Sequence, residues 1–163
     1  MIVVSDTTPL NYLILVDSVH VLPSLFVRVH APSAVIAELS HSKAPETVRR
    51  WSASPPEWLK VQDPTTTDAS LKLGSGETAA IALGQELKAD WILIDERKGT
   101  REAQGRGLRV AGTLTILEEA GARGLLDYQQ TIDRLVSETT FHLTDQVLKD
   151  SEQRYRDRQG ELA

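Results

Sequence analysis

Trp91-Ile92-Leu93-Ile94-Asp95 is a continuous apolar run that ends on an acid. An apolar run without polar alternation is typical of a strand that a parallel sheet buries on both faces. Parallel strands need a crossover between them, which is usually a helix. The run therefore predicts an α/β protein in which Asp95 stands at the carboxyl end of a central strand.

Short β-branched runs and helical patterns alternate on both sides of this strand. Residues 2–4, 27–29 and 108–111 predict three further strands, and residues 55–67, with three prolines and three successive threonines, predict an exposed connection. Helices are predicted over residues 9–16, 33–39, 45–52, 77–87, 97–104 and 113–119. This alternation favours an α/β fold with a mostly parallel sheet covered by helices.

Composition limits the class of protein. The chain has 163 residues, of which 40% are hydrophobic and 25% charged, so we expect one globular domain over residues 1–150. Residues 151–163 are polar, and we expect them to form a tail that frays. The sequence has no cysteine, which excludes disulfides, thiolate zinc sites and cysteine nucleophiles.

Charge and hydropathy narrow the class further. The net charge of −5 argues against a general DNA-coating protein, whose affinity rests on a basic surface. A nucleic-acid enzyme stays compatible with it, because clustered carboxylates hold metal ions that reverse the local field. No apolar run approaches the roughly 20 residues of a membrane helix, and no basic region precedes the first apolar segment. We therefore expect a cytoplasmic protein without a membrane partner.

Four acids are expected at one edge of the sheet. Asp6 closes the first strand and Asp95 the central one, whereas Glu77 opens a helix after Gly74-Ser75-Gly76. Glu38 lies near the end of the helix that begins after Pro32. Ligands of open α/β sheets bind beyond the carboxyl ends of the strands, so we expect the four acids to surround one pocket. Crowded carboxylates stay ionised only when a cation compensates them.

A site whose only ligands are carboxylate oxygens favours Mg²⁺ or Mn²⁺. Such ions activate water for phosphodiester cleavage. Each acid has another interpretation when it is taken singly. Asp6 and Asp95 are also suited to turns or helix caps, and Glu77 is favourable beside a helix dipole. Glu38 alone is compatible with a solvated helix face. The placement of all four by one topological rule favours the metal site.

Four ordered blocks of this sequence resemble the PIN-domain ribonucleases, and most closely their VapC-like branch. The resemblance covers residues 2 to about 120, with a looser helical match to about 150. It implies a three-layer α/β/α sandwich, Mg²⁺- or Mn²⁺-dependent endoribonuclease activity on single-stranded or structured RNA, and the toxin role of a bacterial toxin–antitoxin pair. The blocks are Ser5-Asp6-Thr7-Thr8-Pro9-Leu10, Val35-Ile36-Ala37-Glu38-Leu39, Gly74 to Leu83, and Leu93-Ile94-Asp95-Glu96-Arg97 through Gly112 to Leu117.

The resemblance also implies roles for single residues. The catalytic and metal-binding acids are Asp6, Glu38, Glu77 and Asp95, and Thr7 is the small polar neighbour of the first. Where the branch has two adjacent aspartates, this chain has Asp95 followed by Glu96, so Glu96 is the alternate fourth acid.

Basic residues after Asp95 place positive charge beside the expected acidic pocket, where an RNA backbone needs it. A solvated helix face is the other interpretation of such a cluster. The residues are Arg97, Lys98, Arg101, Arg106 and Arg109.

Two other functions are compatible with parts of the sequence. A non-catalytic PIN-fold module would bind RNA or protein without cleaving. A dinucleotide-binding module would use Gly74, Gly76 and Ala79, with Asp95 closing a strand 19 residues after Gly76. Residues 71–73 make a poor strand for that motif, and Glu77 would set a negative charge beside the pyrophosphate.

The early helices carry more apolar residues than one side of a small sheet needs. We therefore expect a two-fold homodimer, the commonest closed assembly, with an antitoxin as a further partner. The other interpretation is that these residues complete the monomer core. They are Leu10, Leu13, Leu15, Leu22, Leu25, Val35 and Trp51.

Overall fold

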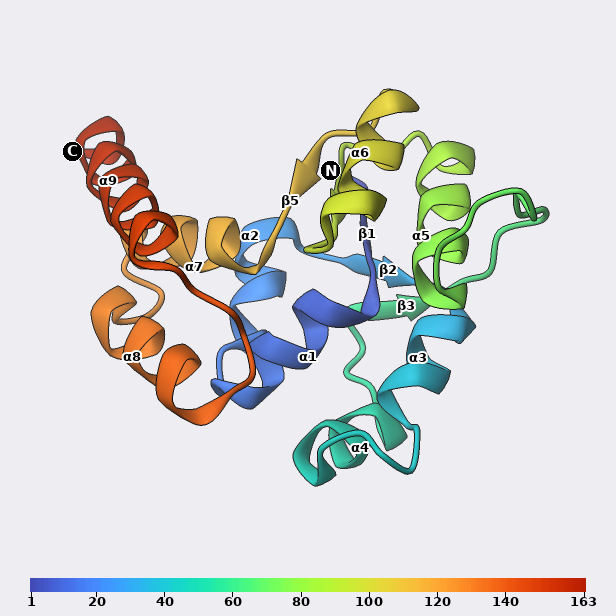
Figure 1. Cartoon of the computed structure of the whole chain (residues 1–163), viewed down its shortest axis with the longest axis horizontal. Helices are drawn as coiled ribbons and strands as arrows, with labels where there is room; N and C mark the ends of the chain where they lie inside the picture. The colour runs from blue at the N-terminus through green and yellow to red at the C-terminus, as the bar shows by residue number, and fades with distance from the viewer.

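The computed structural model describes residues 1–163 and has a five-stranded sheet at its centre (Figure 1). All neighbouring strands are parallel, and their order is β3-β2-β1-β4-β5. The expected α/β fold with a parallel sheet is confirmed. The strands are β1 (Val3–Ser5), β2 (Val29–Ala31), β3 (Leu59–Val61), β4 (Trp91–Leu93) and β5 (Val110–Ala111).

The order of the strands reverses between β1 and β4. From β1 the chain moves outward to β2 and β3, and it then returns to the other side of β1 for β4 and β5. Ser5 is in register with Leu93, so the two central strands end side by side. Ligands of doubly wound sheets bind at such a switch point, outside the carboxyl ends of the strands. Asp6 follows β1 directly, and Asp95 follows β4 after Ile94.

One face of the sheet is covered by α1 (Thr7–Leu15), α2 (Leu22–Phe26) and α7 (Thr113–Ala122). Val3, Leu93 and Val29 point into this layer, where they share a core with Leu10 and Ile116. The helices α3 (Ser33–Leu39), α4 (Glu46–Ala53) and α8 (Tyr128–Glu138) extend the same core outward.

The other face is covered by α5 (Ser75–Glu86) and α6 (Arg97–Gly105). Val4, Ile92 and Ile94 point to this side, because successive strand residues alternate between the two faces. They pack against side chains such as Leu83 and Ala103. The sheet therefore lies between two helical layers, as the three-layer sandwich requires (Figure 1).

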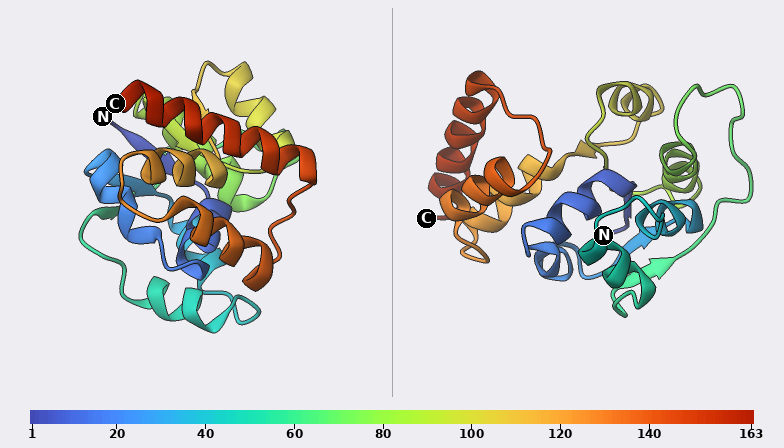
Figure 2. Two further views of the ribbon diagram at one scale, coloured as in Figure 1. Left: turned by 90° about the vertical axis from the view of Figure 1, so that its left-hand side faces the viewer. Right: turned by 60° about the horizontal axis from the view of Figure 1, so that its bottom comes forward.

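The C-terminal helix α9 (Asp145–Leu162) lies across α7 and α8, as the left view of Figure 2 shows. Residues 151–162, which we expected to be a fraying tail, are helical in the structure. Arg154 donates to both carboxylate oxygens of the fully buried Glu118 at 2.8–3.1 Å, and Tyr155 stacks on Tyr128 at 4.2 Å. A hydrophobic pattern does not reveal the Arg154–Glu118 contact, because both side chains are charged.

Two strand predictions need correction. The connection predicted over residues 55–67 contains β3, which is only three residues long and sits at the edge of the sheet with only Leu59 buried. The strand predicted over residues 27–29 is shifted and begins at Val29. Val27 has a φ of 67°, which no strand residue adopts.

The apolar residues that led us to expect a dimer belong to the monomer core. Leu10, Leu13, Leu22 and Val35 are fully buried, and the other three are partly buried against the same core. The homodimer stays a prediction that needs another surface. No single helix has the length and hydropathy to cross a membrane; only α1 taken together with Val19–Phe26 meets that test, and this pair is bent by 116°.

Candidate active site

Asp6 lies at the switch point, between the end of β1 and the start of α1. Its backbone N–H donates to the Leu93 carbonyl at 2.9 Å, which ties it to the end of β4. It occupies the N-cap position of α1, yet its side chain makes no capping hydrogen bond. The side chain is buried, with 3% of the residue exposed, and its Oδ1 has no hydrogen-bond partner. A helix cap therefore does not explain this aspartate.

The pKa of Asp6 reports on the acids around it. Burial raises this pKa most, and the negative charges of Glu77, Glu38 and Asp95 raise it further, to about 7 against an ordinary value of 3.8. Hydrogen bonding to the Thr7 backbone opposes these effects only in part. The structure thus brings the other three predicted acids within electrostatic reach of Asp6 at the carboxyl edge.

Glu38 connects three elements at this edge. From α3 it accepts hydrogen bonds from the Thr7 hydroxyl of α1 at 2.5 Å and from the Gly76 N–H of α5 at 2.7 Å. Gly76 belongs to the first turn of α5, so the carboxylate satisfies a free N–H and adds negative charge where the helix dipole favours it. Both carboxylate oxygens of Glu38 are therefore engaged within the protein.

Glu77 is the least satisfied of the acids on the helices. Its Oε2 is buried and has no hydrogen-bond partner. Burial raises the pKa of Glu77, and the charges of Glu96 and Glu38 raise it further. A hydrogen bond from the Gly74 backbone acts in the opposite direction. Glu77 is therefore like Asp6: each carboxylate has one buried oxygen that accepts no hydrogen bond from the protein.

Two glycines let backbone approach these carboxylates closely. A Cβ on Gly76 would lie 2.7 Å from Glu38 Oε1, and a Cβ on Gly99 would lie 2.5 Å from Glu77 Oε2 and 2.6 Å from Ile94 Cδ1. Both carboxylate contacts are shorter than any a real side chain makes. Gly99 is therefore a site residue that sequence reasoning missed, since its closeness to Glu77 appears only when α6 is placed against α5.

Asp95 has a different environment. Its Oδ1 accepts from the Thr113 N–H and its Oδ2 from the Thr113 hydroxyl, both at 2.7 Å. Burial raises the pKa of Asp95 more than these hydrogen bonds lower it. Asp95 thus fastens the end of β4 to the first turn of α7 and also adds charge near Asp6. Glu96 is exposed, makes no capping bond at the start of α6, and lies close enough to Glu77 to raise its pKa.

The acidic edge fits a hard cation in part. Asp6 Oδ1 and Glu77 Oε2 are anionic oxygens without donors, which is what an oxygen-seeking divalent ion satisfies. No three acidic or histidine side chains converge closely enough to enclose an ion as the structure stands. Three cavities of the protein are lined by residues other than these acids.

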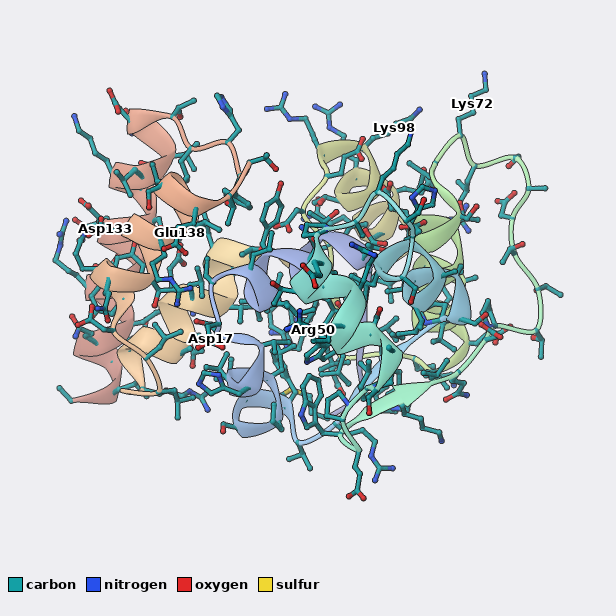
Figure 3. The ribbon with its side chains drawn as sticks, turned by 90° about the horizontal axis from the view of Figure 1, so that it is seen from below. Asp17, Arg50, Lys72, Lys98, Asp133 and Glu138 are labelled. Carbon is teal, nitrogen blue, oxygen red and sulfur yellow. The ribbon has the colours of Figure 1, made fainter.

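The predicted basic residues divide into two groups. Arg97, Lys98 and Arg101 are exposed on α6 and form no ion pair. Lys98 donates to the Lys72 carbonyl at 3.0 Å, which ties α6 to the loop before α5, and Figure 3 shows the two lysines on the same side of the molecule.

The other two arginines are engaged elsewhere. Arg106 pairs with Asp68 and Glu102, each at 2.9 Å. Arg109 stacks over Trp91, with its guanidinium 4.0 Å from the ring centre. Trp91 begins β4, so Arg109 lies at the opposite end of the strands from the acids. The expectation that these two arginines line the acidic edge is therefore wrong.

The geometry also rules out the dinucleotide motif. Residues 62–74 form a loop between β3 and α5, so no strand leads into Gly74. This loop stands away from the body of the protein in the right view of Figure 2. The Gly76 N–H, which a pyrophosphate would need, already binds Glu38.

Comparison with known proteins agrees with the fold. A family model described as a PIN domain matches residues 2–156, which run from β1 into α9. No curated protein matches the chain.

Proposed function

The chain belongs to the PIN-domain family, whose members are generally nucleases, and we propose from this membership and from the acidic edge that it is a metal-dependent endoribonuclease. The observation that carries the proposal is the pair of buried oxygens without hydrogen-bond partners, Asp6 Oδ1 and Glu77 Oε2. Both lie at the switch point of the sheet, where α/β proteins bind their ligands.

In this proposal Asp6 and Glu77 hold Mg²⁺ or Mn²⁺. Glu38 and Asp95 add negative charge around the ion and keep the neighbouring helices in place, and Glu96 is the alternate fourth acid. A bound divalent ion would supply a water of lowered pKa and compensate charge on the scissile phosphate. Without the ion, the raised pKa of Asp6 leaves its carboxyl group half protonated near neutral pH.

The RNA backbone would lie along the exposed basic side of α6. Arg97, Lys98 and Arg101 have no acidic partner there, so their charge is free for phosphates. Thr7 lies beside Asp6 and holds Glu38, which gives it a role in orienting the acids at the substrate side. Binding through phosphates weakens steeply as salt rises.

The test is cleavage of a single-stranded RNA pool by the purified chain with Mg²⁺, with Mn²⁺, and with EDTA. We expect cleavage only with a divalent ion, and its loss in Asp6→Asn and in Glu77→Gln. Glu57→Gln is the matched control, because Glu57 is exposed and makes no ion pair. Cleavage that persists in EDTA or in Asp6→Asn would refute the metal site, and RNA binding without cleavage would favour the non-catalytic module.

We further propose that the protein acts in the cytoplasm as a VapC-like toxin with a cognate antitoxin, and that it works as a homodimer. The four sequence blocks support the branch. Induced expression of the wild type, but not of Asp6→Asn, should arrest bacterial growth. Sedimentation at micromolar concentration should give twice the 18.0 kDa mass of the chain, and a single 18.0 kDa species would refute the dimer alone.

A further inference from the structure

A second surface lies at the amino ends of the strands, on the edge opposite to the acids. A cavity of about 360 Å³ opens there between α2, α7 and the starts of β4 and β5. Its apolar lining comes from Met1, Leu25, Phe26 and Trp91, among others. In Figure 1 this edge lies at the N-terminal end of β1, away from α1. We call these four residues, together with Val27 and Arg109, the amino-edge surface.

Val27 is the most exposed large apolar residue of the protein, at 81%, and Met1 follows at 72%. Val27 comes directly after Phe26, which lines the cavity, so this exposed apolar residue is next in the chain to the cavity lining. Exposed apolar side chains grouped beside a cavity are typical of surfaces that bind another protein. Single exposed apolar residues are common, but here they adjoin partly buried apolar side chains of the same surface.

The backbone at Val27 is strained. Its φ is 67° and its ψ is −55°, and the Arg28 N–H donates to the Phe26 carbonyl at 2.7 Å across it. This is the γ-turn with positive φ, the rare and strained form, and a β-branched residue is disfavoured there. A glycine would relieve the strain. The valine is therefore unexplained by folding, and strain of this kind gathers at functional surfaces.

The rim of the cavity is basic although the whole chain is acidic. Arg109, Arg123 and Arg158 line it with Glu119 as the only acid. Glu119 bonds Arg123 at 2.7 Å and Arg158 at 3.0 Å, and Arg109 lies over Trp91 without an ion pair. Arg158 also pairs with Glu118 at 3.6 Å, so Arg109 is the guanidinium of the rim without a carboxylate partner, and the cavity lining itself holds three arginines and one acid.

We propose that the amino-edge surface docks a segment of another protein, in which an apolar side chain fills the cavity and neighbouring acidic residues bind the rim. The apolar lining and the exposed Val27 favour a protein segment over RNA, whose affinity comes mainly from phosphates. The arginines favour an acidic partner, and arginine and tryptophan are both among the residue types enriched at binding hot spots. This inference does not depend on the proposed nuclease activity.

The experiment measures fluorescence polarisation of labelled 12-residue peptides added to the full chain. One peptide has a central phenylalanine flanked by glutamates, and two others replace the glutamates by lysines or the phenylalanine by alanine. We expect only the first to bind. Arg109→Gln should weaken it about tenfold, whereas Arg49→Gln, on the distant α4, should leave its affinity unchanged.

Val27→Gly separates binding from folding. Glycine accepts this backbone conformation without strain, so the variant should resist urea at least as well as the wild type. It should nevertheless bind the glutamate-flanked peptide about threefold more weakly, because it lacks the exposed side chain. A merely structural valine would change stability and leave binding alone.

Three results would overturn the proposal. The first is equal binding of the glutamate and lysine peptides, or no binding of either at 1 mM. The second is an affinity that neither Arg109→Gln nor Val27→Gly changes. The third is that a labelled single-stranded RNA binds the chain and that Arg109→Gln weakens this binding, because the surface would then be a second RNA contact.

Discussion

Replacing Asp6 by asparagine tests the electrostatics of the acidic edge without any substrate. The folded protein holds the Asp6 pKa at about 7, whereas in the unfolded chain the carboxyl group returns to 3.8. Between these two values the folded state binds more protons than the unfolded state. Stability in the absence of metal therefore falls as pH rises through this window, and the full penalty is present above it.

The size of the effect follows from the two pKa values. Each pKa unit corresponds to about 1.4 kcal/mol, so ionising Asp6 lowers the free energy of unfolding by about 4 kcal/mol at pH 8. At pH 5 most of the folded molecules still hold the proton, and the loss is only about 1.7 kcal/mol. Asparagine carries no charge at either pH. The advantage of Asp6→Asn over the wild type should therefore grow by about 2.5 kcal/mol from pH 5 to pH 8.

The assay is urea unfolding of both proteins in EDTA at pH 5 and pH 8. All other titrating groups are common to the two proteins, so the difference between their unfolding free energies reports on Asp6 together with its coupling to Glu77, Glu38 and Asp95. Glu57→Gln is again the control and should show no growing advantage. An advantage of Asp6→Asn that is equal at both pH values, or a variant less stable than the wild type at pH 8, would refute the reasoning.

Adding a divalent ion should reduce the stability advantage of Asp6→Asn over the wild type at pH 8. A ligand at 100 times its Kd stabilises the folded state by about 2.7 kcal/mol, and only the protein with both unpartnered carboxylates intact should gain fully. Mn²⁺ should therefore raise the urea midpoint of the wild type at pH 8 more than that of Asp6→Asn. Equal gains would place the ion elsewhere.

Three further variants test the contacts around the acids and α9. Gly99→Ala should displace the neighbouring Glu77 carboxylate and cut RNA cleavage at least tenfold in a rate assay, whereas Gly105→Ala on the same helix, where a Cβ meets nothing within 4 Å, should leave the rate unchanged. Asp95→Asn should lower the urea unfolding free energy by about 1–3 kcal/mol, because it weakens the anchor of α7, while Glu96→Gln should change it by less than about 0.5 kcal/mol. Arg154→Ala should leave a buried carboxylate with a poorer partner, cost about 3 kcal/mol, and speed hydrogen exchange throughout α9.

The central strands and the acids after them were predictable from the sequence, because their signals are local. Val3 and Val4, like Ile92 and Leu93, form apolar runs that both helical layers bury, and an acid follows each run. The strand β3 gave no such signal. It is an edge strand whose pairing partner, β2, lies 30 residues earlier in register, from Val29 to Leu59, and two of its three side chains are exposed.

Contacts made by polar groups far apart in sequence were not predictable in this way. The helix α9 is held by Arg154 on Glu118, 36 residues apart, and Asp95 is held by Thr113, 18 residues away. Neither pair has a periodic signature, because one polar residue on each partner suffices. Residues 151–163 were expected to fray because their own pattern is polar, whereas the place of α9 in the fold depends on these pairs.

The sequence gives no reason to distinguish the four acids from one another. In the structure they differ in whether their carboxylate oxygens accept hydrogen bonds. Glu38 and Asp95 are saturated by hydrogen bonds from helix N-termini and hydroxyls, and these hydrogen bonds tie neighbouring elements of the fold together. Asp6 and Glu77 keep a buried oxygen without a donor, and their ionisation works against folding. A protein that retains two such groups side by side gives up stability at the point where its two central strands end. A bound cation would restore this stability. The argument for a metal site therefore rests on the two buried oxygens without hydrogen-bond partners and not on the number of acids.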